Sequence, residues 1–154
     1  MGYNFTIGNA VPSFDKSEFP DLRARWVVEH ASHPDAPVFP NDYASGNYRS
    51  PCYSVWKEFC QVTGIYDLFY EEETGRLHAG HPGCVGITED DANAVTAALL
   101  CYQANATKPP GFERDDSSPE RASMYDHNLA RLIWLEWWMH WAIRNCETPA
   151  IQNT

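Results

Sequence analysis

Alternating apolar and polar positions near the start of the chain predict two short β-strands. The stretch YNFTIG, residues 3–8, alternates large apolar side chains with asparagine and threonine, which is the period of a half-buried strand. The stretch RARWVVEH, residues 23–30, repeats the pattern, and two strands this close in sequence can pair. Residues 30–50 are too rich in Pro, Gly, Asn and Asp for a regular element, and a loop of this length is usually functional or mobile.

Apolar positions with a helical period follow this loop and predict two helices. The first is expected near residues 51–63, between a Ser-Pro pair that suits a helix start and Gly64, which suits a left-handed stop. A short apolar element, IYDLFY, follows it. Thr88 and Asp91 resemble a capping box that opens a helix near residues 89–105. The residues expected to face the core are Tyr53, Trp56, Phe59 and Cys60 on the first helix, and Ala92, Val95, Leu99 and Tyr102 on the second.

The last predicted helix is the longest. Ser117 and Glu120 form a capping box, and because no glycine or proline follows until Pro149, one helix is expected over about residues 118–146. Its length of roughly 42 Å is about the diameter of a domain of this size. The sequence therefore predicts a single α+β domain, residues 1–154, with short N-terminal antiparallel strands packed on three helices.

Tryptophan is concentrated in this last helix. The stretch LIWLEWWMHW holds four of the six tryptophans in the chain. At about 100° per residue, Trp134, Trp138 and Trp141 fall on one side of the helix, together with His127 and Arg131. Two interpretations remain open for this stripe. It is either the core-facing side of a central helix, or it lines a ligand pocket or a self-association surface.

A ligand site on this stripe has a definite expected chemistry. Arginine clamps anions in a bidentate manner, and tryptophan offers a flat stacking surface, a combination that suits phosphates and nucleobases. Arg131 and His127 are expected to contact phosphate, with a tryptophan stacked on the base and the 30–50 loop closing over the ligand. The predicted binding residues are Arg131, His127, Trp134, Trp138, Tyr43 and Arg49.

A second group of chemically active side chains lies in the stretch LHAGHPGCVGIT. His78, His81 and Cys84 recur at three-residue intervals and are plausible zinc ligands, or a thiol nucleophile with a histidine base. The paired Cys-x-x-Cys spacing of strong zinc motifs is absent, so the main expectation is a structural turn with neither metal nor cofactor. Candidates for a fourth ligand are Cys52, Cys60, His30 and His33.

The composition of the chain limits the kinds of molecule that it is expected to bind. The chain has 21 acidic and 11 basic residues and a formal net charge of −10, a field that repels duplex nucleic acid and anionic membranes. The five cysteines follow no disulfide framework, and the chain has neither a signal-like start nor an apolar run of the ~20 residues that cross a bilayer. A cytoplasmic protein with free thiols, associating as a homo-oligomer, is expected.

The stretches SPCYSVWKEFC, LHAGHPGCVGIT and LARLIWLEWWMHWAIRNCETPA resemble a group of uncharacterised small proteins of bacteria and their phages, over about residues 50–150. The resemblance brings no fold, activity or site, but it implies a setting in which small phage proteins counter host defences. The leading hypothesis is a non-enzymatic protein that sequesters a small nucleotide-like anionic signal. The alternatives are an acidic inhibitor that binds a host defence protein, and a Cys/His-dependent enzyme or metalloprotein using residues 78–84.

Overall fold

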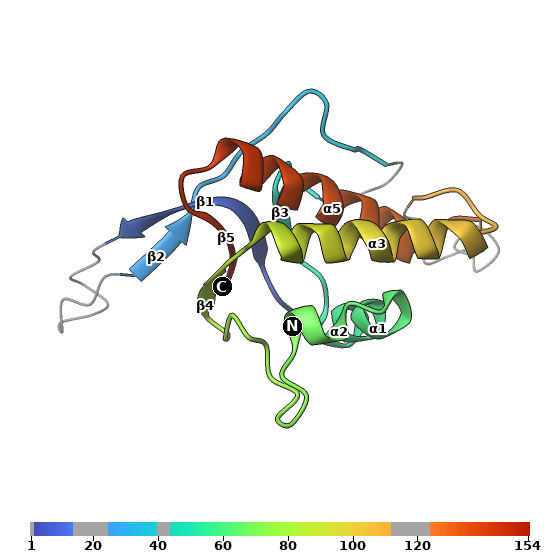
Figure 1. Ribbon diagram of the computed structural model, residues 1–154, viewed down its shortest axis with the longest axis horizontal. Helices are drawn as coiled ribbons and strands as arrows, with labels where there is room; N and C mark the ends of the chain where they lie inside the picture. Colours follow the sequence, from blue (N-terminus) through green and yellow to red (C-terminus); the bar gives the residue numbers. More distant parts are fainter. Residues whose placement is uncertain (1, 14–24, 40–43, 112–123) are drawn as a thin grey trace.

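The computed structural model describes residues 2–13, 25–39, 44–111 and 124–154. It confirms the α+β class, since an antiparallel sheet packs against helices in one body (Figure 1). The strands are β1 (Phe5–Ser13), β2 (Arg25–Val28), β3 (Tyr48–Arg49), β4 (Gly83–Gly86) and β5 (Pro149–Asn153). The helices are α1 (Tyr53–Thr63), α2 (Tyr66–Phe69), α3 (Glu89–Asn105) and α5 (His127–Asn145).

The sheet has the order β2-β1-β5-β4, and β3 pairs with the start of β1. The expected pairing of the first two strands is confirmed, with Ala10 opposite Val28. The C-terminal strand β5 was not predicted, yet it lies at the centre of the sheet, where Ile151 is opposite Ile7 of β1 and Val85 of β4. The end of the chain therefore completes a sheet that its beginning starts.

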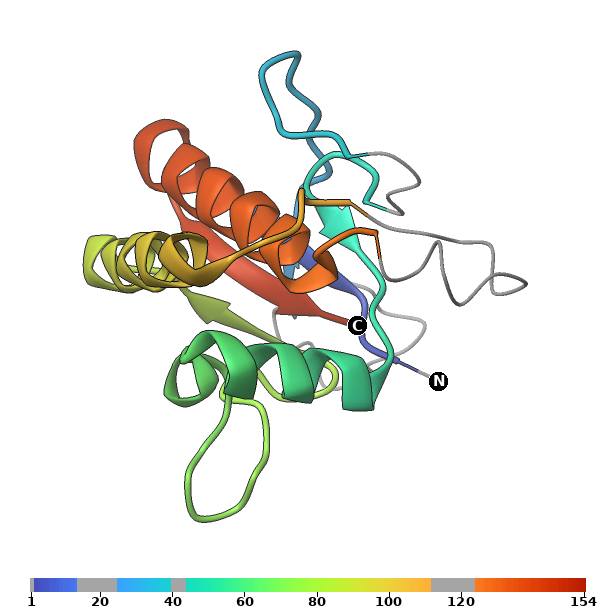
Figure 2. The same ribbon diagram turned by 90° about the vertical axis from the view of Figure 1, so that its right-hand side faces the viewer.

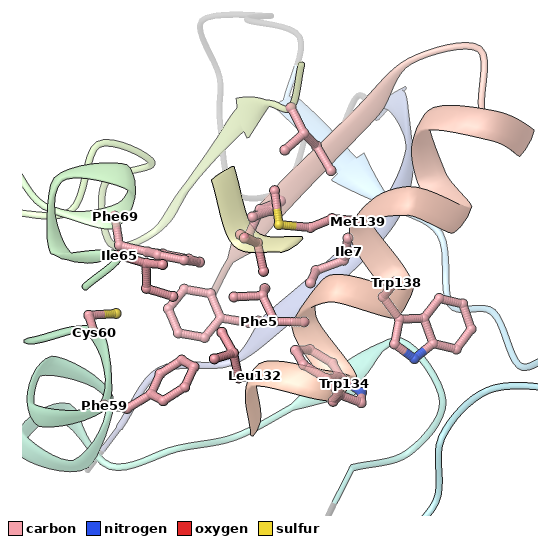
Figure 3. Close-up of a cluster of buried hydrophobic side chains, with 14 of the residues drawn as sticks. Phe5, Ile7, Phe59, Cys60, Ile65, Phe69, Leu132, Trp134, Trp138 and Met139 are labelled. Carbon is pink, nitrogen blue, oxygen red and sulfur yellow. The ribbon is translucent and has the colours of Figure 1, made fainter. Parts of the chain in front are cut away.

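α3 and α5 lie side by side over one face of this sheet, and α1 lies beside them (Figures 1 and 2). Figure 3 shows the core between them, where Phe5 and Ile7 of β1 meet Leu132, Trp134 and Met139 of α5. The apolar periods of strand and helix therefore point at the same interior.

The predicted helix ends are confirmed where local chemistry decides them. Gly64 ends α1 in the left-handed conformation, at φ 78°, and its N–H donates to a carbonyl of the last turn. Both hydrogen bonds of the Thr88–Asp91 capping box are present at the start of α3. The expected start of α1 is wrong by two positions, because Cys52 rather than Ser50 is its N-cap.

The last helix is shorter than expected. Residues 124–126 are not helical, and α5 begins at His127 with Asp126 as N-cap, whose carboxylate accepts from the N–H of Leu129 at 2.9 Å. The predicted cap residues Ser117 and Glu120 lie outside the described residues. None of the helices in the described ranges is both long and apolar enough to cross a membrane.

The described part of the 30–50 loop is tied to the sheet. Asn47 is fully buried, and its side-chain amide donates to the carbonyls of Ile7 and Glu29 while its Oδ1 accepts from the N–H of Ala31. β3 forms within this segment. Asn47 and β3 therefore belong to the sheet layer, whereas residues 32–35 and Val38 are exposed, and the expectation that the loop closes over a ligand stays a prediction.

Candidate functional site

A cavity of about 790 Å³ is lined by the C-terminal half of α3, the first turns of α5 and the exposed side of α1. Figure 2 shows how these three helices are arranged. Its walls are helical residues together with residues 106–108 and 125–126. Sites for small molecules commonly have volumes of roughly 300–1,000 Å³. The cavity is thus large enough for a ligand of nucleotide size.

One wall carries positive charge. His127, Asn128 and Arg131 lie on the first turns of α5 and line the cavity, and Lys108 joins them from the segment that follows α3. Arg131 Nη1 donates to Asn128 Oδ1 at 3.0 Å, which orients the guanidinium. The N-terminal end of α5 carries a partial positive charge, which the carboxylate of its N-cap Asp126 offsets.

Asp126 connects the elements that form this wall. Tyr102 Oη donates to both of its carboxylate oxygens, at 2.8 and 2.9 Å, and the Asp126 N–H donates to the carbonyl of Pro109 at 2.8 Å. Burial, and then the hydrogen bond and negative charge of Asp126, raise the pKa of Tyr102 to about 12, although Asn128 and Arg131 act in the opposite direction. α3, the segment after it and α5 are thereby joined at one residue, Asp126, through its carboxylate and its backbone N–H.

The α1 residues that line the cavity are two valines, a glutamate and a threonine. Val55, Glu58 and Val62 follow one another at helical spacing and all line the cavity. Val62 keeps 54% of its surface exposed although it is a large apolar residue. Cys101 of α3 also lines the cavity, and its thiol is exposed. The cavity therefore has cationic side chains on the α5 side, and two valines with one carboxylate on the α1 side.

The structure brings together two of the predicted binding residues, His127 and Arg131. Trp134 and Trp138 are fully buried in the core, so the core interpretation holds for them. Trp134 Nε1 donates to the carbonyl of Gly46 at 2.9 Å, and the Arg49 guanidinium lies over the Trp134 ring at 4.8 Å from its centre. Stacking of these tryptophans on a ligand was a wrong expectation, because other side chains already cover both rings.

Arg49 and Tyr43 complete the predicted set. Arg49 is 3% exposed and belongs to the contact with Trp134, which places it in the core layer away from the cavity walls. Tyr43 lies outside the described residues.

Several lining residues were not expected from the sequence. Tyr102 was assigned to a buried stripe, while Glu58, Lys108 and Asp126 carried no motif. The preference of aspartate for N-caps is the one local signal that could have found Asp126. The other residues come together only through the packing of α1 against α3.

The His78, His81 and Cys84 group does not form a common site. The His78 ring contacts a backbone carbonyl of α2, whereas His81 lies between the Tyr53 hydroxyl and the Asn153 amide, each at 2.9 Å. Cys84 packs against a separate small cluster on the sheet, and burial raises the pKa of its thiol. Within the described ranges, no three His, Cys, Asp or Glu side chains converge to hold a metal ion. The weak metal alternative is therefore not supported.

Thr96, Glu136 and His140 form a polar contact between α3 and α5. Thr96 Oγ1 lies 2.6 Å from His140 Nε2 and 2.9 Å from Glu136 Oε1, and it also approaches the carbonyl of Ala92. Although the residue types are those of a hydrolase triad, the hydroxyl is engaged by three partners at once and the group lies away from the cavity. These hydrogen bonds connect α3 to α5.

No family model, curated protein or solved structure matches this chain. The chemistry of the cavity has to be judged from its own residues.

Proposed function

We propose that this protein binds, without chemical conversion, a small anionic nucleotide-like molecule in the cavity between α1, α3 and α5. The observation that carries the proposal is the cavity of about 790 Å³ into which α5 brings both His127 and Arg131. A protein of net charge −10 can still bind an anion at such a place, because a guanidinium at contact distance outweighs distant carboxylates.

The proposed roles follow from the two walls. Arg131 and Lys108 hold the anionic group, with Asn128 keeping Arg131 in position. Val55 and Val62 provide an apolar surface for a flat ring. The tryptophans do not have this role, because they are buried. Sequestration of a nucleotide signal by a phage protein in the cytosol is the setting we propose, and the five free cysteines are consistent with a reducing compartment.

Isothermal titration calorimetry with nucleoside monophosphates, cyclic nucleotides and ADP-ribose tests the proposal. We expect Arg131→Ala to weaken binding by at least about tenfold, because a hydrogen-bonded charge contributes roughly 1.5–3 kcal/mol. Arg144→Ala is the matched control, since Arg144 is exposed on the same helix about 20 Å away. If no nucleotide of the panel gave binding heat, or if Arg131→Ala and Arg144→Ala bound the ligand equally well, the proposal would be contradicted.

A thiol-labelling experiment locates the bound ligand independently. Cys101 lines the cavity, whereas Cys52 is an exposed thiol at the start of α1 and away from it. A ligand at ten times its Kd should slow the alkylation of Cys101 by about tenfold, because only the free protein reacts, while Cys52 keeps its rate. Protection of neither thiol by a ligand that binds in calorimetry would place its site elsewhere.

A further inference from the structure

We infer that the ligand carries a single phosphate-sized anion and a ring system rich in hydrogen-bond donors, as a nucleoside monophosphate does, and that polyphosphates are disfavoured. The inference rests on the proposed function, and it names the class of molecule that the same cavity selects. It follows from the way in which charges of both signs are divided between the walls.

The charges of the described lining residues nearly cancel before a ligand enters. Lys108 and Arg131 bring permanent positive charges, whereas Glu58 and Asp126 bring carboxylates. His127 adds a positive charge only when it is protonated. Because Asp126 is held in place by Tyr102 and by the N–H of Leu129, its negative charge cannot swing away from an incoming anion.

This balance suits one phosphate better than three. A phosphate group carries about −1.5 to −2 at neutral pH, which matches in size the two positive charges of Lys108 and Arg131, and with Glu58 and Asp126 beside them no positive charge remains for a second phosphate. Each further phosphate would extend toward Glu58 or Asp126, or into the field of a chain whose net charge is −10. Like charges a few ångströms apart repel, which disfavours a second phosphate beside either carboxylate.

Glu58 indicates what the other end of the ligand offers. It lies between Val55 and Val62 along α1, and all three residues line the cavity that the first turns of α5 also line. A carboxylate only accepts hydrogen bonds, so it selects amino groups or hydroxyls, while the two valines accommodate the face of a ring. A nucleoside presents these features together: an apolar ring face, donors on the base edge and hydroxyls on the sugar.

The test is a calorimetric comparison of nucleoside monophosphates, the matching triphosphates and inorganic phosphate. A chelator is present throughout, because Mg²⁺ would mask the charge of the triphosphate. We expect the best monophosphate to bind at least about tenfold more tightly than its triphosphate and than phosphate alone, a difference of about 1.4 kcal/mol. Glu58→Gln, a conservative change at an exposed position, should reduce the preference over triphosphate several-fold. Glu147→Gln, which removes the same charge near the far end of α5, should leave it unchanged.

The outcomes separate the inference from the proposed function. Tighter binding of ligands with two or more phosphates would overturn the inference while leaving the cavity as a ligand site, provided that Arg131→Ala still weakens binding. Equal preference in wild type and Glu58→Gln would also overturn it. If no nucleotide gave binding heat in calorimetry and none protected Cys101 from alkylation, both the proposed function and the inference would be overturned.

Discussion

Two parts of one face of α5 have different surroundings: one part is buried in the core, and the other lines the cavity. From the middle of α5 onward, Trp134 and Trp138 are completely buried, and Trp134 packs against the segment that contains Gly46 and Arg49. In its first turns, His127 and Arg131 are only half-buried and line the cavity. Angular position on a helix shows which residues face inward, but the surface opposite decides whether they meet a core or a cavity.

The surface opposite changes along α5 because the sheet does not extend under its whole length. Where β1 lies beneath the helix, Ile7, Leu132 and Met139 fill the space between strand and helix, and Trp134 and Trp138 lie on another side of α5, where Trp134 meets Gly46 (Figure 3). Beyond it, the neighbours are α1 and the C-terminal half of α3, and their side chains leave the cavity open. The tryptophans therefore stabilise the fold, and the site is left to the arginine and its polar neighbours.

Removing a tryptophan at the core end should have the largest effect. We expect Trp134→Ala to lower the free energy of unfolding by about 3–5 kcal/mol, because it leaves a cavity and removes the ring on which Arg49 lies. Chemical denaturation measures this loss. Trp26→Ala is the control, since Trp26 is 47% exposed and its removal should cost far less. A loss at Trp134 no greater than at Trp26 would show that the stripe is not core.

Asn47 tests whether the segment beside the core end is fixed. Asn47→Ala should lower the free energy of unfolding by about 2–4 kcal/mol, because two carbonyls and one N–H lose their partners in a buried place. Asn93→Ala provides the comparison: Asn93 is exposed within α3, where alanine is the better helix former. If Asn47→Ala unfolded at the same denaturant concentration as wild type, the 44–50 segment would not be anchored as described.

The parts of the fold that could be predicted are those decided by neighbouring residues. The Thr88 capping box and the Gly64 stop need only a few adjacent positions, and both were found. β5 was missed because PAIQN has no alternating pattern of its own, and it becomes a strand through pairing on both sides with β1 and β4. The start of α5 was missed because Asp126 caps it while also accepting from Tyr102, which is distant in sequence.

The candidate site was half predictable for the same reason. His127 and Arg131 lie one turn apart on one helix, so their spacing places them together. Trp134 and Trp138 continue that stripe, and periodicity alone does not show that both are buried, with Trp134 held by Gly46 and Arg49. Glu58, Lys108 and Tyr102 come from other elements and meet α5 only in the folded chain.

The smallest expected effect concerns Tyr102 at the cavity end. Its pKa is raised to about 12 from the value near 10 of an unfolded chain, so its contribution to stability is complete below pH of about 10 and is lost as the pH rises toward about 12. The difference in unfolding free energy between wild type and Tyr102→Phe should therefore shrink over that window, as measured by urea denaturation. Phenolate absorbance of wild type and Tyr102→Phe isolates the titration of Tyr102.

In Asp126→Asn, which retains a good N-cap, the titration of Tyr102 should move to lower pH but stay above that of a free tyrosine, because burial is the largest cause of the shift. A titration unmoved by Asp126→Asn would mean that the carboxylate and the phenol are not bonded in solution, and that the cavity end of α5 is held less firmly than its tryptophan end.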